Sequence, residues 1–414
     1  MKVVVAPDSF KGSLSAVAAA RAMARGVRAA APRAEVVEVP VADGGEGTVD
    51  ALVAATGGKH VEARVRDPLG RPIRAKYGIL GDGKTAIIEM AAASGLPLLR
   101  PRERNPMVTS TYGTGEMILD AVKRGAREVI IGIGGSATVD GGTGMARALG
   151  IKFLDAGGGA LEGGGEILRR IRRIDLAART ALIRGVRIVV ACDVTNPLTG
   201  PRGAAFVYGP QKGATPEMVA ALDRGLRNLA RRMREDLGRD VELAEGAGAA
   251  GGLGAGLVAF LGATLRRGVD IVLGAVGFEK KLRGARVVFT GEGRADIQSA
   301  YGKAVSGVAR MAKSHRVPCI LLAGGIGEGA ARLHDEGVTA IFSIADGPAA
   351  EDEMMSGAAA LLRRASEQAT RTFLAGAGRP ARRASGRDLG SRRRRKGGGR
   401  TRSLPSRGRG ADKR

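Results

Sequence analysis

The stretch that decides the fold lies at the start of the chain, where KVVVAPDS (residues 2–9), SAVAAARAMARGVRAAAP (15–32) and EVVEVPVADGG (35–45) follow one another. The first and third are short apolar runs rich in valine, which is typical of buried strands. The second is rich in alanine and arginine and ends at a proline, as a helix does. A strand, a helix and a second strand form a βαβ unit, which predicts a parallel sheet covered by helices.

The same alternation returns at the other end of the chain. After Arg283 come three apolar runs and one helical stretch, namely ARVVFTGEG, residues 305–313, VPCILLAGG and TAIFSIADG. The first and last thirds of the sequence therefore follow the same pattern. We expect them to form one discontinuous, doubly wound domain from residues 1–60 and 284–375.

The middle third has a different pattern. Residues 60–80 alternate in polarity and turn at DPLGRP, which predicts a β-hairpin. Residues 215–238 predict one long amphipathic helix that Thr215 caps and Gly238 stops. Buried strands are expected within KTAIIEMAAASG, EVIIGIGG and RIVVACDV. These features predict an inserted α/β domain over residues 61–283.

Length and composition support two packed domains and a separate tail. The chain has 414 residues, of which 44% are hydrophobic and only 3% aromatic, so its cores depend on Ala, Val, Ile and Leu. Residues 376–414 hold 15 Lys and Arg against 2 Asp and Glu, which is +13 of the total formal charge of +25. We predict that this basic tail is disordered, and either has no role or makes unspecific, salt-sensitive contacts with nucleic acid.

Several classes of protein are disfavoured by what the sequence lacks. No apolar run approaches the length of a membrane span or a signal peptide, which predicts a cytoplasmic protein without membrane contact. Cys192 and Cys319 lie in apolar runs and are expected to be buried thiols without a disulfide. The three histidines argue against a zinc hydrolase, and neither a G-x-S-x-G elbow nor a G-x-x-x-x-G-K-[ST] loop is present.

Polar residues follow four of the candidate strands at the point where each strand ends. The four segments are Asp8-Ser9-Phe10-Lys11, Asp43-Gly44-Gly45-Glu46, Asp193-Val194-Thr195-Asn196 and Glu292-Gly293-Arg294-Ala295-Asp296. Ligands of open parallel sheets bind outside the carboxyl ends of the strands, so these segments are expected to converge on one polar cleft. Carboxylates beside glycine turns and basic side chains suit a magnesium–phosphate ligand, which favours phosphoryl transfer.

The acids of the first two segments also have a purely structural interpretation. Asp8 could cap the helix that begins near Ser13. Asp43 and Glu46 could cap the helix that begins at Thr48. Ser9 and Lys11 could likewise be ordinary loop residues.

The later segments carry the same alternative. Asp193 precedes Asn196-Pro197 and could be a plain turn residue. Glu292 and Asp296 could pair locally with Arg294. The repetition of acids at strand ends, more than any single acid, favours a functional site.

A glycine-rich loop, GIGGSATVDGGTG (132–144), follows one of the middle strands and leads into a candidate helix. Such a turn lets backbone N–H groups approach an anion, with the positive end of the next helix nearby. The residues expected to contact the anion are Gly134, Gly135, Ser136, Gly141 and Gly142. The loop has no lysine of its own, so a cation would come from Lys11, Arg294 or Lys303. The alternative is a tight turn needed only for packing.

Seven long motifs follow one another along the chain. They are APDSFKGSLSA, PVADGGEGT, TSTYGTGEMI, GIGGSATVDGGTGMARALG, ACDVTNPLTGPRGAAFVYGPQKGA, GAGAAGGLGAGLVAFLGA and TGEGRADIQSAYGK. Together they resemble the bacterial type of glycerate kinase. The resemblance runs from Met1 to about Leu374. It implies ATP-dependent phosphorylation of D-glycerate with Mg²⁺, with the 2-position favoured, and a flavodoxin-like lobe made by the two chain ends.

The last motif departs from the family pattern at three positions. Ile297 stands where the family often has serine, Tyr301 where histidine is common, and Val305 where proline follows. The acids, the arginine and the Gly-Lys pair of the motif are retained, namely Glu292, Arg294, Asp296, Gly302 and Lys303. Activity is therefore expected, but no role of the family's histidine transfers to this chain.

The reaction that the resemblance implies gives each predicted site residue a hypothetical role. The attacking hydroxyl of glycerate needs a proton acceptor, for which we favour Asp296, with Asp193 as the rival. The carboxylate of glycerate needs a cation, for which Arg294 and Lys11 are the candidates.

The remaining acids and bases are assigned to the metal and the phosphates. Asp8 and Asp43 are expected to hold Mg²⁺, directly or through water. Ser9 and Lys303 are expected to contact the transferred phosphoryl group, and Glu292 belongs to the same binding set.

Two other functions stay open from the sequence. One is a small-anion or nucleotide-binding regulator without catalysis, and the other is an enzyme that acts on a related hydroxy acid. The expected partners are small molecules, namely ATP and D-glycerate. The oligomeric state is left open.

Overall fold

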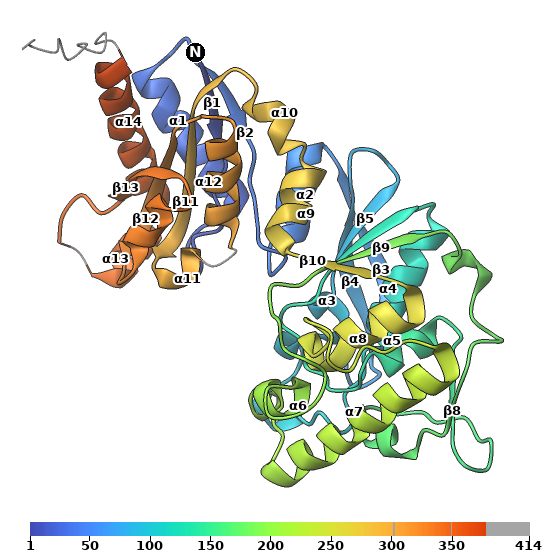
Figure 1. Cartoon of the computed structure of the whole chain (residues 1–414). Helices are drawn as coiled ribbons and strands as arrows, with labels where there is room; N and C mark the ends of the chain where they lie inside the picture. The colour runs from blue at the N-terminus through green and yellow to red at the C-terminus, as the bar shows by residue number, and fades with distance from the viewer. Residues whose placement is uncertain (301–302, 349, 378–414) are drawn as a thin grey trace, which may run out of the picture.

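The chain forms two large sheets, each covered by helices, in a computed structural model that describes residues 1–300, 303–348 and 350–377 (Figure 1). This arrangement confirms the predicted α/β class. The predicted basic tail lies almost wholly outside the described residues. Within them, no helix is long and apolar enough to cross a membrane.

The first sheet unites the two ends of the chain. Its strands are β1 (Lys2–Val5), β2 (Glu35–Glu38), β11 (Ala285–Ala295), β12 (Cys319–Ile326) and β13 (Val338–Ser343). All neighbours are parallel, and the order is β2-β1-β11-β12-β13, which is the doubly wound order of flavodoxin-like sheets. The order reverses between β1 and β11, and such a switch point is where these sheets bind ligands.

Helices cover both faces of this sheet, which explains its unbroken valine runs. The covering helices are α1 (Ala16–Ala30), α12 (Ala304–Ser314) and α14 (Ala358–Ala377). Val3 and Val5 pack on the face that α1 and α14 cover, and Val4 packs on the opposite face with α12 (Figure 1). Successive residues thus enter different cores, as the pleat requires.

The second sheet lies within the middle of the sequence. Its strands, in spatial order, are β10 (Thr264–Arg266), β9 (Arg187–Ala191), β6 (Glu128–Gly132), β5 (Thr85–Glu89), β4 (Pro72–Ile79) and β3 (Lys59–Arg66). The hairpin predicted over residues 60–80 is confirmed as the antiparallel pair β3 and β4. The strands β5, β6, β9 and β10 are parallel, so their carboxyl ends share one edge. A small separate ladder pairs β7 (Lys152–Leu154) with β8 (Arg173–Asp175).

Several helices pack around the second sheet. They are α3 (Ala91–Ser94), α4 (Tyr112–Lys123), α5 (Thr143–Ala148), α6 (Ala204–Tyr208), α7 (Pro216–Leu237) and α8 (Ala249–Leu261). The long predicted helix is confirmed as α7: Thr215 Oγ1 accepts a hydrogen bond from Met218 N at 3.3 Å, and Gly238 ends the helix at φ +66°. Both local signals therefore act as predicted.

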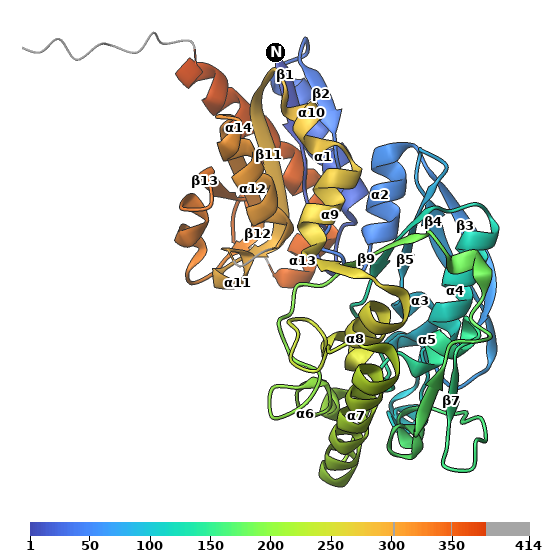
Figure 2. The ribbon, with the colours of Figure 1, turned by 45° about the vertical axis from the view of Figure 1, so that its right-hand side comes forward.

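Two helices, α2 (Thr48–Thr56) and α9 (Gly268–Ala275), lie between the sheets (Figures 1 and 2). One continuous apolar cluster includes Val4 of β1, Leu52 of α2 and Val189 of β9. The two sheets are thus joined by packed side chains near the site. The domain boundaries near residues 60 and 284 stay a prediction.

The remaining short helices lie near the ends of the strands or connect them. They are α10 (Phe278–Leu282), α11 (Ile297–Ala300) and α13 (Glu351–Ser356). The two cysteines are free thiols, as expected. Cys319 is buried in β12, whereas Cys192 is only partly buried because it lies just beyond the end of β9.

Candidate active site

Asp8 lies at the switch point of the first sheet. The N–H of Asp8 donates to the carbonyl of Gly291 at 2.8 Å, so the segment after β1 continues to run alongside β11. Asp8 Oδ1 accepts from the N–H of Ser9 at 2.6 Å. Burial, reinforced by the charge of Asp43, raises the pKa of Asp8 to about 7. Ser15 caps α1, so capping does not account for Asp8.

The segment after β2 carries Asp43 towards the second sheet. Asp43 Oδ1 accepts from the N–H of Gly45 at 3.1 Å, which shapes the loop. A methyl group on Gly44, where φ is +95°, would lie 2.6 Å from the side chain of Ala191 at the end of β9. One on Gly134 would lie 3.6 Å from Gly45. The Asp43 loop therefore packs directly against the strand ends of the second sheet.

The cap of α2 comes from a residue that sequence reasoning missed. Glu89, at the end of β5, accepts a hydrogen bond from Val49 N at 2.9 Å. Gly47 precedes the helix in a left-handed conformation and has no side chain to offer. Capping by Asp43 is thereby replaced by a long-range contact, which leaves the Asp43 carboxylate available for another purpose.

Asp193 is more than a turn residue. Its Oδ1 accepts a hydrogen bond at 2.9 Å from the N–H of Gly268, the first residue of α9. Desolvation raises the pKa of Asp193 to about 6, although this hydrogen bond lowers it, and the charge of Asp43 raises it further. Asp193 thus joins the end of β9 to the start of a helix between the sheets.

Glu292 is the most buried acid of the β11 segment. Only 8% of it is exposed, and its Oε1 has no hydrogen-bond partner among the described residues. Desolvation raises the pKa of Glu292 to about 7, and the nearby Lys303 opposes that shift. An unpartnered buried carboxyl oxygen beside a lysine is a ready acceptor for a ligand hydroxyl.

Arg294 and Asp296 form the exposed part of the same segment. Arg294 Nε lies 3.9 Å from Asp296 Oδ2, and the arginine side chain is 73% exposed. Asp296 Oδ1 also accepts from the N–H of Gln298 at 2.8 Å. The local pairing considered from the sequence is therefore present for Asp296 with Arg294, but it is loose and open to solvent.

These acids form one electrostatic network across the strand ends. Besides burial, the charges of Asp43 and Lys303 shift the pKa of Asp8. Besides burial, the charges of Lys303, Asp8 and Asp296 shift the pKa of Glu292. Asp43 also acts on Asp193, at the end of β9. Ser9 and the exposed Lys11 follow Asp8, and a methyl group on Gly293 would lie 3.2 Å from Lys11 N. The residues predicted at four strand ends are thus brought together.

The two halves of the glycine-rich loop differ. Gly134 and Gly135 are exposed at the end of β6, with Gly135 at φ +72°. The N–H of Gly141 donates to Gly251 O at 3.0 Å, and that of Gly142 donates to Asp140 Oδ1 at 3.0 Å. The amides of Gly141 and Gly142 are therefore already used within the protein.

Two buried charges beneath this loop were missed from the sequence. Lys212 donates to Ser136 Oγ at 2.7 Å, and Asp140 accepts from the N–H and hydroxyl of Thr111, both at 2.8 Å. Both residues lie inside long motifs, VDGG and GPQKGA, which gave the only signal for them. The charged side chains face inward, so no local periodicity distinguishes them.

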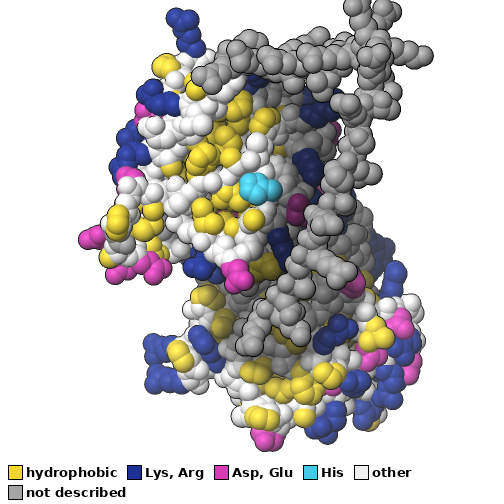
Figure 3. Space-filling model, turned by 60° about the vertical axis from the view of Figure 1, so that its left-hand side comes forward, with side chains coloured by type: hydrophobic (Ala, Val, Ile, Leu, Met, Phe, Trp, Pro, Cys, Tyr) yellow, Lys and Arg dark blue, Asp and Glu magenta, His cyan; other side chains and the backbone are white. Residues whose placement is uncertain are grey.

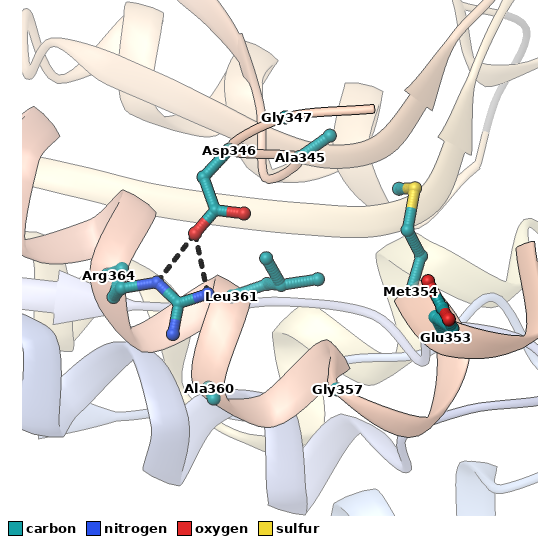
Figure 4. A pocket seen from close by; sticks show the side chains of 9 residues that line it. All are labelled: Ala345, Asp346, Gly347, Glu353, Met354, Gly357, Ala360, Leu361 and Arg364. Atoms are coloured by element: carbon teal, nitrogen blue, oxygen red, sulfur yellow. Dashed lines mark hydrogen bonds and ion pairs between the residues drawn. The ribbon is translucent and has the colours of Figure 1, made fainter. Parts of the chain in front are cut away.

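A cavity of about 300 Å³ lies elsewhere, between the loop after β13 and the helices α13 and α14 (Figure 4). Two nitrogens of Arg364 reach Asp346 Oδ2 at 2.6 and 2.8 Å across its wall. None of the predicted site residues lines it. On the face shown in Figure 3, basic and acidic side chains are intermixed and form no single patch.

The comparisons with known proteins show which family the chain belongs to. Residues 3–374 match the profile of the Glycerate kinase family. The chain is 50% identical to a glycerate kinase of Bacillus subtilis (strain 168), over 88% of this chain and 95% of that one. It is 48% identical to glycerate 2-kinase of Escherichia coli (strain K12), over 91% of this chain and 99% of that one.

A solved structure agrees as well. A crystal structure of a Salmonella typhimurium LT2 protein classed as a glycerate kinase 2 matches with a TM-score of 0.85 and 46% identity. It covers 91% of this chain and 99% of that chain.

The fold and the comparisons together define an α/β phosphotransferase with an alcohol group as acceptor. Within that class, the chain belongs to the glycerate kinase family.

Proposed function

We propose that this protein transfers the γ-phosphoryl group of ATP to the 2-hydroxyl of D-glycerate, giving 2-phosphoglycerate. The observation that carries the proposal is the convergence of Asp8, Asp43, Glu292 and Lys303 at the switch point of the first sheet. The 48% identity to a glycerate 2-kinase supports the choice of the 2-position.

Asp8 and Asp43 are the proposed ligands of Mg²⁺. Among the described residues, no group of three or more potential metal-ligating side chains is already assembled. This fits Mg²⁺, which is usually bound by one or two carboxylates together with substrate phosphates and water. Burial and the charge of Asp43 raise the pKa of Asp8, and a bound cation would stabilise its charged form. When bound, the ion would neutralise charge on the phosphates.

The phosphates and the glycerate carboxylate need separate donors. We assign the transferred phosphoryl group to Ser9 and Lys303, and the glycerate carboxylate to Arg294 and Lys11, which are both exposed. The proposed anion loop is limited to residues 134–136, because the amides of Gly141 and Gly142 already have acceptors. Glu292 would accept a hydrogen bond from the substrate through its free oxygen.

Asp296 is the proposed base. As the 2-oxygen of glycerate forms its bond to the γ-phosphorus, the bond from that phosphorus to the β-γ bridging oxygen breaks, leaving ADP. The hydroxyl proton passes to the Asp296 carboxylate. The rival, Asp193, is already engaged by Gly268, which makes it the weaker candidate.

Phosphorus NMR of the product tests this function. We expect ADP release that depends on D-glycerate and a product signal of 2-phosphoglycerate. A 3-phosphoglycerate signal would contradict the regiochemistry. Faster turnover of another hydroxy acid from an acceptor panel would contradict the substrate.

A further inference from the structure

Lys212, the last residue of the short helical turn Pro210–Lys212, is a buried lysine with an unusual set of neighbours. Only 1% of it is exposed. Its Nζ donates hydrogen bonds to Ser136 Oγ at 2.7 Å and to the carbonyl of Thr138 at 2.8 Å. Both acceptors belong to the glycine-rich loop after β6, so a single ammonium group supports that loop from within.

Burying this charge is costly, and packing alone does not require it. Desolvation lowers the pKa of Lys212 to about 7, and only the charge of Asp140 opposes the shift. The two hydrogen bonds that Lys212 Nζ makes go to Ser136 and Thr138 rather than to Asp140. Replacing buried charges by apolar groups of similar volume is often neutral or stabilising. The charge therefore points to a role beyond filling space.

The chemistry of the ammonium group fixes the direction of the Ser136 hydroxyl. In its protonated form Lys212 can only donate hydrogen bonds, so Ser136 Oγ then accepts from it. The hydroxyl hydrogen of Ser136 then has to point away from the lysine. A hydroxyl that accepts from a cation is also polarised, which strengthens it as a donor.

The far end of the loop is anchored independently. Asp140 is fully buried and accepts hydrogen bonds from Thr111 N, Thr111 Oγ1 and Gly142 N. These contacts tie the loop to the first turns of α4 and α5. With Lys212 at one end and Asp140 at the other, the loop is held rigid before any ligand arrives, as an anion site requires.

Lys212 also lies close to Tyr208, the last residue of α6. Its Nζ lies 6.0 Å from the centre of the Tyr208 ring, within cation–π range. The Tyr208 hydroxyl donates to Asn196 Oδ1 at 2.6 Å, three residues beyond Asp193. Lys212 therefore bonds the loop that follows β6 directly and lies near the loop that follows β9 through Tyr208.

We propose that Lys212 is a positioning residue that fixes the Ser136 hydroxyl as a donor to an anionic group of a substrate bound at residues 134–136. The ligand chemistry is an anionic oxygen, from either an ATP phosphate or the glycerate carboxylate. The inference rests on the proposed function of this loop.

The test is steady-state kinetics of the full chain with ATP and D-glycerate varied separately. We expect Lys212→Met and Ser136→Ala each to raise the KM of one substrate by about tenfold to a hundredfold, the effect of losing a hydrogen bond with a charged partner. The double variant should be no worse than Lys212→Met, because the lysine acts through the serine. A rise in the ATP KM identifies a phosphate, and a rise in the glycerate KM identifies the carboxylate.

Tyr77→Phe is the matched control. Tyr77 is fully buried in β4, and its hydroxyl donates to Asp120 Oδ2 at 2.7 Å, away from the strand-end loops. We expect it to lower Tm and leave both KM values unchanged. The same pattern in Lys212→Met would overturn the inference, as would additive losses in the double variant.

A second lysine variant covers the case in which Lys212→Met fails to fold. If Lys212→Met does not fold, Lys212→Gln and Ser136→Ala decide the question, and unchanged KM values in both overturn it. Turnover of D-glycerate by the wild-type protein tests the proposed function. The ratio of the variant KM to the wild-type KM tests the role of Lys212. The two failures are thus distinguishable.

Discussion

Asp193 Oδ1 accepts a hydrogen bond at 2.9 Å from the N–H of Gly268, so an acid at the end of β9 holds the first turn of α9 between the sheets. This contact gives Asp193 a structural task that needs an oxygen but no negative charge. Among the residues that the structure describes, Asp296 has no comparable long-range hydrogen bond, since it bonds Gln298 and lies near Arg294. The two acids proposed as base are therefore separable by experiment.

Asp296→Asn should lower kcat on the order of a hundredfold or more, the usual contribution of a general base, and leave substrate affinity near the wild-type value. Asp193→Asn should cost less in kcat, because its amide oxygen can still accept from Gly268. Steady-state kinetics gives kcat for both variants, and a separate binding measurement gives their affinity for glycerate. Turnover of Asp296→Asn within a few-fold of wild type would exclude it as the base.

Asp8 and Asp43 make a prediction about the metal. Loss of even an outer partner of a metal ligand typically costs about 10- to 100-fold in affinity, so Asp8→Asn and Asp43→Asn should raise the Mg²⁺ concentration for half-maximal activity at least about tenfold. The thermal shift given by Mg²⁺ with ADP should shrink in parallel. Asp50→Asn is the control, because Asp50 is an exposed acid that pairs with His60 and Lys76 on the surface. An equal effect in all three variants would disprove specific ligation.

Glu292 predicts a pH-dependent stability. Burial raises its pKa from 4.5 to about 7, so the folded state holds the proton more tightly than the unfolded chain. Its favourable contribution is complete below pH 4.5 and is lost as the pH rises through 7. Glu292→Gln removes the buried charge and should melt a few degrees above wild type at pH 8.

At pH 5 the difference should be small, since Glu292 is then protonated and resembles the amide. Melting curves at the two pH values, without ligand, provide the measurement. A gain of equal size at both pH values would show that the stabilisation is unrelated to titration. Activity should fall in the same variant if the free carboxyl oxygen binds substrate.

Much of the fold was predictable because its signals are local. The valine runs of β1 and β11, the capping Thr215 and the terminal Gly238 each depend on neighbours in the sequence, and each is confirmed. The family motifs supplied what local rules could not, namely the chemistry.

The missed residues share a physical cause. Glu89 caps a helix 40 residues earlier in the chain, and Lys212 bonds a serine 76 residues away. Such partners meet only after the sheet order is set, and neither side chain disturbs the local apolar pattern. Strand ends could be foreseen as a site, but the contacts that fix each loop there could not.

The packing of the Asp43 loop supports a final prediction about Gly44. Gly44 and Gly47 both have positive φ, at +95° and +85°, so alanine is strained at either position. Only Gly44 is also crowded, because an added methyl group would lie 2.6 Å from the side chain of Ala191. We expect Gly47→Ala to cost roughly 1 kcal/mol of unfolding free energy, and Gly44→Ala to cost more.

Gly44→Ala should also lower kcat, since it pushes the loop that carries Asp43 away from the ends of β6 and β9. Denaturant unfolding and steady-state kinetics are measured on both variants. Gly47→Ala reports backbone strain alone, and Gly44→Ala reports strain together with displacement of the Asp43 loop. Equal losses of activity would mean that the fit of this loop against the second sheet does not position Asp43.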